Sequence, residues 1–148
     1  MSIIAMSNSS ENMKSLKDYG FNSDNKVYVI AEIGINHGGD IDMAKRLIDS
    51  ASKTGVDSVK FQTYITEKRV SIDSPIFDIL KLCELRFEDF ERLKHHAENQ
   101  GLEFFSTPFD DESVECLEEI GVNLFKVASF DVVNQKLLRR IAETKKTI

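Results

Sequence analysis

Two lysines stand in segments that otherwise read as apolar strands, and they are the side chains best suited to chemistry. Lys60 lies in the run Ser58–Thr63 and Lys126 lies in the run Leu124–Ala128. Strands of a parallel sheet are covered on both faces and read as apolar runs. An unpaired ammonium group in such a strand is costly, so each lysine needs an anionic partner. A buried carboxylate would serve for one lysine, whereas two in similar surroundings favour a shared anionic ligand at the strand ends.

Further polar side chains follow the same apolar runs. They are Glu32, Gln62, Ser106, Thr107 and Ser129. In a (β/α)8 barrel the polar residues of the active site gather at the carboxyl ends of several strands. The turn after the first run, residues 34–40, lacks the glycine spacing of a dinucleotide-binding fold and does not match a P-loop. The pattern therefore favours a barrel over a nucleotide-binding doubly wound sheet.

The elements that must position these residues alternate along the chain. We expect strands at residues 27–33, 58–63, 102–106 and 124–128, with Thr147 and Ile148 beginning a fifth, and helices starting after Asp40, at 76–83, at 87–100, near Asp110–Glu112 and after Asn134. Asp40 and Asn134 are suited to cap helices, and Pro108 is expected to end the third strand. Alternating βα units give a parallel sheet. A barrel needs roughly 250 residues, so residues 27–148 correspond to its first four βα units.

Composition narrows the class of protein. The chain has 148 residues, 41% of them hydrophobic and 30% charged, which suits one soluble domain after a polar, mobile N-terminal arm at residues 1–26. A net charge of −6 argues against nucleic-acid and membrane-surface partners. No apolar run approaches the roughly 20 residues of a membrane span, and the first residues do not form a secretory signal. Cys83 and Cys116 read as reduced core residues, which predicts a cytoplasmic protein.

Four motifs resemble those of the sialic acid synthase family. They are Ala31–Asp40, Val59–Thr63, Phe105–Phe109 and Lys126–Asp131, one at each expected strand end. The resemblance covers roughly residues 27–148. It implies the N-terminal half of a (β/α)8 barrel within a longer enzyme that also carries a small antifreeze-like domain. Such enzymes are transferases of carbohydrate biosynthesis that condense phosphoenolpyruvate with an N-acetylated amino sugar, giving a nine-carbon 2-keto acid and phosphate. They are domain-swapped homodimers.

The resemblance also implies roles for individual residues. Lys60 and Lys126 would hold the carboxylate and phosphate of phosphoenolpyruvate, while Thr107 and Ser129 would donate hydrogen bonds to it. Two cations and two hydroxyls can neutralise and orient such an anion. Glu32 would lie beside the reacting carbons, to stabilise a cation or carry a proton. Its structural alternative is to pair only with a lysine.

Three further residues resemble the lining of the sugar pocket. They are Gln62, Phe109 and Asp131. Asp131 stands where the family often has glutamate, and Phe130 stands where it often has glycine, so the sugar contact differs in detail. Gln62 could instead be a satisfied core amide. N-acetylmannosamine is the leading acceptor, with the diacetamido sugars that yield legionaminic or pseudaminic acid as rivals.

The family also implies a divalent metal, manganese or magnesium, whose histidine ligands come from later strands. His37, His95 and His96 show no metal spacing, so no metal ligand is predicted in this chain. His37 is expected in the site or the loop around it, and His95 and His96 are expected to be solvated. The chain alone should be inactive. Two other functions stay open: a class I aldolase using Lys126 or Lys60 as a Schiff base, and a non-catalytic half-barrel that self-associates through its sheet edges.

Overall fold

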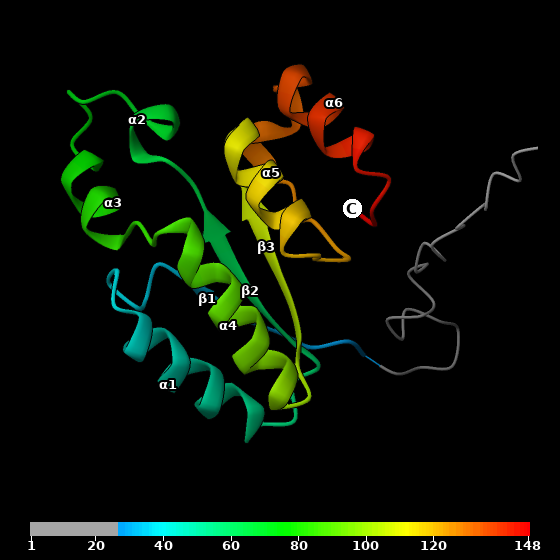
Figure 1. Ribbon diagram of the computed structural model, residues 1–148. Helices are drawn as coiled ribbons and strands as arrows, with labels where there is room; N and C mark the ends of the chain where they lie inside the picture. Colours follow the sequence, from blue (N-terminus) through cyan, green and yellow to red (C-terminus); the bar gives the residue numbers. More distant parts are fainter. Residues whose placement is uncertain (1–26) are drawn as a thin grey trace, which may run out of the picture.

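The order of elements follows the alternation expected from the sequence. The computed structural model describes residues 27–148; the predicted arm at residues 1–26 lies outside the described residues. The elements are β1 (Ile30–Gly34), α1 (Ile41–Ser52), β2 (Ser58–Thr63), α2 (Thr66–Arg69), α3 (Phe77–Cys83), α4 (Phe87–Asn99), β3 (Glu103–Pro108), α5 (Asp111–Glu119), the 3-10 helix η2 (Ser129–Val133) and α6 (Gln135–Glu143). Figure 1 shows α1, α4 and α5 packed along one face of the sheet, with α2 and α3 at its upper end.

The three strands form one parallel sheet in the order β1-β2-β3. The register pairs Glu32 with Lys60 and Lys60 with Phe105, and an irregularity follows Glu32 on β1. Two residues further along, Gln62 pairs with Thr107. All three pairings are parallel, as the βα alternation requires.

The hydrophobic core lies between the sheet and the helices. β2 and β3 contribute Val59, Phe61 and Phe104, and the rings of Phe61 and Phe104 stack with centroids 5.2 Å apart. The helices add the apolar side of each amphipathic pattern: Ala44, Ile48, Phe90, Leu93, Val114, Leu117, Leu137 and Ile141. Burial of these aliphatic and aromatic side chains is the main stabilisation of the unit. Cys83 and Cys116 are both free and buried, as predicted.

Side-chain caps begin the helices that were expected to have them. Asp40 Oδ1 accepts hydrogen bonds from the backbone N–H groups of Asp42 and Met43, at 2.8 and 3.1 Å. Asn134 Oδ1 accepts from Leu137 N–H at 3.3 Å. These contacts satisfy N–H groups that the first helical turn leaves without partners, and both predicted caps are confirmed.

The first and third predicted strands have different bounds in the structure. The first begins at Ile30 rather than residue 27, because only residues 30–34 join the ladder with β2. The third continues through Pro108, which pairs with Thr63. Proline lacks only the N–H donor, and at the last position of a strand that donor is dispensable. Helix α2 was not predicted.

The predicted fourth strand at residues 124–128 is reduced to two isolated parallel bridges. Phe125 pairs with Ser106, and Leu124 pairs with Thr147. Phe125 N–H donates to Thr147 O at 2.8 Å and Lys126 N–H donates to Ser106 O at 3.1 Å. The ladder stops there because the chain turns into η2 at Ser129. Thr147 takes the position expected for the start of the next strand.

Among the described residues, no helix combines the length and apolar character needed to cross a membrane.

Candidate functional site

The sheet face turned away from the helices carries the polar residues that the sequence singled out. Side chains alternate between the two faces of a strand, and directly paired residues share a face. Phe61 and Phe104 belong to the core under the helices, so Lys60, Gln62 and Thr107 point to the opposite face. We call this the open face.

Lys126 reaches the same face through its neighbour. Phe125 is bridged to Ser106 and lies in the core on the helix side. Because successive side chains alternate, Lys126 points to the open face beside Thr107. The two lysines thus lie on one face of the sheet, as a shared anion requires.

Lys60 forms an ion pair with Glu32 across the β1–β2 ladder. The ammonium group bonds to Glu32 Oε2. The Lys60 side chain is 12% exposed, whereas that of Glu32 is 51% exposed. A buried cation needs such compensation, so Glu32 pairs with a lysine, and its place beside the reacting carbons stays a prediction. The contact also keeps a carboxylate beside the cation on the open face, because Glu32 and Lys60 are paired in the register.

Thr107 has a buried hydroxyl that is free to bond. It is 2% exposed, and Oγ1 has no hydrogen-bond partner among the described residues. Buried hydroxyls are normally paired. By contrast, the Ser106 hydroxyl lies 2.7 Å from Thr63 Oγ1, and this buried pair is structural. Ser129 is exposed at the start of η2.

A cationic residue that the sequence analysis missed joins the three predicted sugar-pocket residues. Arg69 Nη1 donates to Gln62 Oε1 at 3.0 Å. The guanidinium carbon lies 3.8 Å from the ring centroid of Phe109 and 4.6 Å from that of Tyr64. Asp131 attracts the same charge, and burial lowers the pKa of Arg69. We call these five residues the Arg69 cluster.

Asp131 and Phe109, two members of the cluster, are both buried. Asp131 Oδ2 has no hydrogen-bond partner among the described residues. Phe109 stacks on Phe130 with ring centroids 5.8 Å apart, and Phe130 remains exposed.

The sequence offered little indication that Arg69 belongs to the site, because it lies in a polar connection outside the predicted strands.

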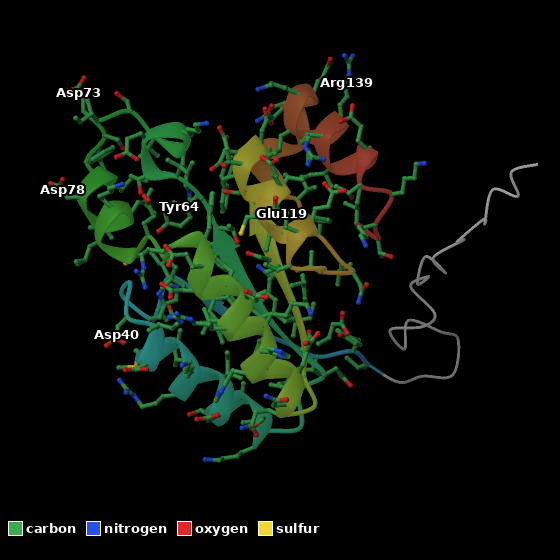
Figure 2. The ribbon with its side chains drawn as sticks, in the orientation of Figure 1. Asp40, Tyr64, Asp73, Asp78, Glu119 and Arg139 are labelled. Carbon is green, nitrogen blue, oxygen red and sulfur yellow. The ribbon has the colours of Figure 1, made fainter. Side chains whose placement is uncertain are left out.

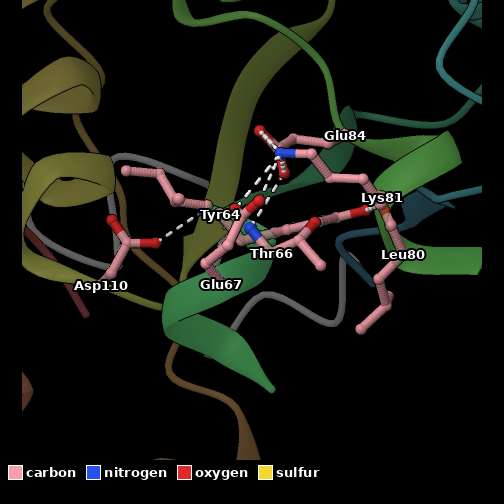
Figure 3. Close-up of polar contacts among 8 residues, drawn as sticks. Tyr64, Thr66, Glu67, Leu80, Lys81, Glu84 and Asp110 are labelled. Atoms are coloured by element: carbon pink, nitrogen blue, oxygen red, sulfur yellow. Dashed lines mark hydrogen bonds and ion pairs between the residues drawn. The ribbon is translucent and has the colours of Figure 1, made fainter. Parts of the chain in front are cut away.

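The segment that carries Arg69 is fastened to α3. Tyr64 lies between the end of β2 and α3 (Figure 2), and its hydroxyl donates to Leu80 O at 2.9 Å. Burial raises the pKa of Tyr64 to about 12. At the start of α2, Thr66 N–H donates to Glu84 Oε2 at 2.9 Å. These contacts are drawn in Figure 3.

Two more contacts fix α2 from the other sides. Lys81 bridges Glu67 and Glu84, with its ammonium 3.0 and 3.1 Å from their oxygens. Ile65 N–H donates to Asp110 Oδ2 at 2.8 Å, while Asp110 Oδ1 caps α5. Asp110 therefore ties the end of β2 to the start of α5 (Figure 3).

The histidines have structural partners. His37 is buried; its Nδ1 accepts from Gly39 N–H at 3.1 Å, so Nε2 donates to Gly34 O at 3.0 Å. His37 therefore shapes the loop after β1, and burial lowers its pKa. His95 is exposed, but His96, predicted to be solvated, contacts Asp49 Oδ1 at 2.7 Å because α4 packs on α1. Residues 27–148 contain no group of His, Cys, Asp or Glu side chains that could hold a metal ion.

Known proteins resemble this chain in sequence. An N,N'-diacetyllegionaminic acid synthase of Campylobacter jejuni is 35% identical over 137 residues, which cover 83% of this chain and 41% of that protein. An uncharacterized protein of Methanocaldococcus jannaschii is 43% identical over 121 residues, covering 82% of this chain and 36% of that one. The chain thus spans about two fifths of the length of these relatives.

Solved structures agree. The N-acetylneuraminic acid (sialic acid) synthetase of Leptospira borgpetersenii matches with a TM-score of 0.80 at 38% identity, over 82% of this chain and 43% of that one. A 3-deoxy-D-arabino-heptulosonate 7-phosphate synthase of Thermotoga maritima, at 15% identity and a TM-score of 0.59, shares the fold. The sequence profile of the NeuB family matches residues 47–148. On these grounds the chain belongs to the NeuB family.

Proposed function

We propose that this chain is the N-terminal half of a (β/α)8 barrel whose complete form condenses phosphoenolpyruvate with an N-acetylated amino sugar. The products would be a nine-carbon 2-keto sugar acid and phosphate. One observation carries the proposal: Lys60 and Lys126 share a sheet face with the buried hydroxyl of Thr107, which has no hydrogen-bond partner within residues 27–148. Relatives named as synthases of legionaminic and sialic acids support it.

The half-barrel proposal rests on the topology. Strands β1, β2 and β3 are parallel and adjacent in chain order, and Phe125 and Thr147 extend that order by single bridges. A barrel is built by adding strands in this sequence, with the helices outside. The open face would then line the barrel interior.

Phosphoenolpyruvate suits the charges of the open face. Its carboxylate and phosphate would be neutralised by Lys60 and Lys126, and Thr107 and Ser129 would donate hydrogen bonds to its oxygens. Charge-assisted hydrogen bonds of this kind are the stronger ones. Because Lys60 and Thr107 are fixed on strands of the sheet, little reorganisation of these donors is needed when charge shifts during the reaction.

The proposed reaction forms one C–C bond and breaks one C–O bond. Carbon 3 of phosphoenolpyruvate attacks the aldehyde carbon of the open-chain sugar, forming the new C–C bond, and the aldehyde oxygen takes up a proton. Positive charge develops at carbon 2, where water adds. Loss of phosphate with C–O cleavage leaves the 2-keto acid. Glu32, beside Lys60, would stabilise the cation or accept a proton from the water.

Other features of the proposal come from the family resemblance. The divalent metal, manganese or magnesium, finds no ligand group in residues 27–148, so its ligands would lie in the rest of the protein. A cytoplasmic homodimer is the proposed form of the complete enzyme.

The proposal is tested with the full-length protein. It is incubated with phosphoenolpyruvate, manganese and each of three acceptors: N-acetylmannosamine and the diacetamido precursors of legionaminic and pseudaminic acids. Acceptor-dependent release of phosphate together with a 2-keto acid is expected. Phosphate release without a 2-keto acid, or no reaction with any acceptor, would contradict it.

A further inference from the structure

The Arg69 cluster carries an inference that rests on the proposed function and deepens it. Its starting point is the bond between Arg69 Nη1 and Gln62 Oε1, at 3.0 Å. A guanidinium group has five N–H donors and no acceptor. Only the oxygen end of the Gln62 amide can therefore face Arg69, and the NH2 end must point away from it.

The surroundings on the other side agree with this orientation. The Gln62 Nε2 atom lies toward Gly34, where a methyl group added to that glycine would stand 3.4 Å from it. The same methyl group would stand 3.3 Å from Glu32 Oε1. The amide nitrogen of Gln62 and the carboxylate of Glu32 thus both lie near Gly34.

Arg69 is itself held in place. Its guanidinium contacts the rings of Tyr64 and Phe109, and such cation–π contacts fix a planar group over an aromatic face. The nearby charge of Asp131 offsets part of the cost of burying the cation. Tyr64 is bonded in turn to α3 through Leu80 O. A side chain with these contacts can impose an orientation on its neighbour.

We propose that Arg69 is a positioning residue that turns the NH2 group of Gln62 toward the acceptor, and so selects acceptors that present an oxygen there. The carbonyl oxygen of an N-acyl group has the required chemistry. An acceptor with a free amine in that position would place donor against donor, and an unpaired donor in a closed site is costly.

The first experiment compares three variants of the full-length protein by steady-state kinetics. Arg69→Met keeps the length of the side chain and its contact with the rings but removes the donors. It should raise the KM for the N-acylated acceptor by roughly tenfold, the scale of one hydrogen bond to a charged group, with the KM for phosphoenolpyruvate unchanged. Arg69→Lys, which keeps the charge, should recover part of this loss. Arg139→Met, on the outer side of α6 (Figure 2), is the control and should match the wild type.

A double-mutant cycle then separates positioning from direct contact. In a Gln62→Ala background, Arg69→Met should change the acceptor KM by no more than about twofold, the usual margin of additivity. Full multiplication of the two single effects would overturn the inference, because Arg69 would then act independently of Gln62. An equal change in the KM of phosphoenolpyruvate would overturn it as well.

A structural readout keeps the two proposals apart. If the wild-type protein condenses no acceptor, the proposed function fails. The role of Arg69 is then decided by crystal structures of the ligand-free wild type and Arg69→Met proteins. The Gln62 side chain should adopt one conformation in the first and several in the second. An unchanged Gln62 in Arg69→Met would overturn the positioning role.

Discussion

Lys60 and Lys126 differ in how their charge is compensated. Lys60 has a carboxylate partner in Glu32 and is largely buried, whereas Lys126 is half-buried and is tied to β3 by its backbone N–H. A ligand with two anionic groups on the open face would therefore contact two different cations. Lys60 is already paired with Glu32, whereas Lys126 would gain an anionic partner from the ligand. Both should matter for the reaction.

In the full-length protein, Lys60→Ala and Lys126→Ala should each lower kcat/KM. The loss of transition-state stabilisation should be roughly 2–4 kcal/mol, the scale for losing a preorganised electrostatic contact. The reason is that each removes a charge fixed where the phosphate or carboxylate would lie. Initial rates of phosphate release measure the effect. Lys136→Ala is the control, since Lys136 is exposed and pairs with Asp111 on the helix side. Wild-type kinetics in either lysine variant would refute its role.

Borohydride trapping distinguishes the proposed synthase from a Schiff-base aldolase. A Schiff base forms when a lysine amine attacks a carbonyl, and in this structure the Lys60 ammonium is held in an ion pair with Glu32. Treatment of the full-length protein with pyruvate and borohydride should therefore leave the mass of the protein unchanged. A covalent adduct at Lys60 or Lys126, located by peptide mass spectrometry, would support the aldolase.

Tyr64 gives the protein a pH dependence in the alkaline range. The unfolded chain loses the phenol proton near pH 10, whereas burial holds the folded pKa at about 12. Between these values the unfolded state binds fewer protons, so this residue's contribution to stability falls as pH rises. The difference in free energy of unfolding between wild type and Tyr64→Phe should shrink over that interval, as measured by urea denaturation. A constant difference would contradict the assignment.

For individual residues, the sequence predicted the positions of side chains on the strands better than the membership of the Arg69 cluster. Lys60, Gln62 and Thr107 could be placed because strand periodicity determines which face each one occupies. Arg69 could not, since its contacts with Phe109 and Asp131 arise only when α2 folds back over the ends of β2 and β3. The ligand-binding roles of all these residues, and those of Lys126 and Ser129, stay predictions.

Among the elements, the loop after β1 lies very close to the backbone of α3. At Gly39 an added methyl group would stand 2.2 Å from Leu82 O, and the backbone φ is +78°. Gly38 also has positive φ, at +59°, but faces open space. The two adjacent glycines therefore separate the cost of backbone strain from the cost of displacing α3.

Gly38→Ala should destabilise the protein by roughly 1–2 kcal/mol, the cost of a left-handed conformation. Gly39→Ala should cost more, roughly 2–5 kcal/mol in all, because backbone atoms of α3 must also shift. Thermal or urea unfolding of the full-length variants measures both. Equal losses would show that α3 moves freely away from the loop.

The elements predicted well were those with local signals. The caps Asp40 and Asn134 announce their helices in sequence, and β2 matches its predicted bounds because its apolar residues alternate with the polar ones. The fourth strand was predicted to be longer than it is, because an apolar run indicates that residues are buried but not that they pair with another strand. Its ladder length depends on Ser106 and Thr147, which are distant in sequence.

The molecule as a whole leaves apolar side chains exposed. They include Ile72, Ile79, Leu82, Phe130, Val132 and Val133, with Val133 at 80% exposure. Within the described part of the chain, β1 pairs only with β2, so one strand edge is also open. Exposed strand edges and apolar patches promote association.

Residues 1–148 expressed alone should therefore self-associate and show no condensation activity. Light scattering measures the mass in solution, and a 2-keto acid assay with manganese measures activity. The full-length protein serves as the reference for both. A compact monomer with turnover near that of the full-length enzyme would contradict the half-barrel proposal.

The order of the strands has a consequence for synthesis on the ribosome. β2 pairs with β1, β3 pairs with β2, and Phe125 then joins β3, so each strand meets a partner that has already been made. The sheet can grow vectorially as the chain emerges, without waiting for distant segments. The newest strand always presents a free edge. During a translational pause after β3, the edge of β3 would stay unpaired. Nascent chains of this protein should depend most on chaperones during such a pause.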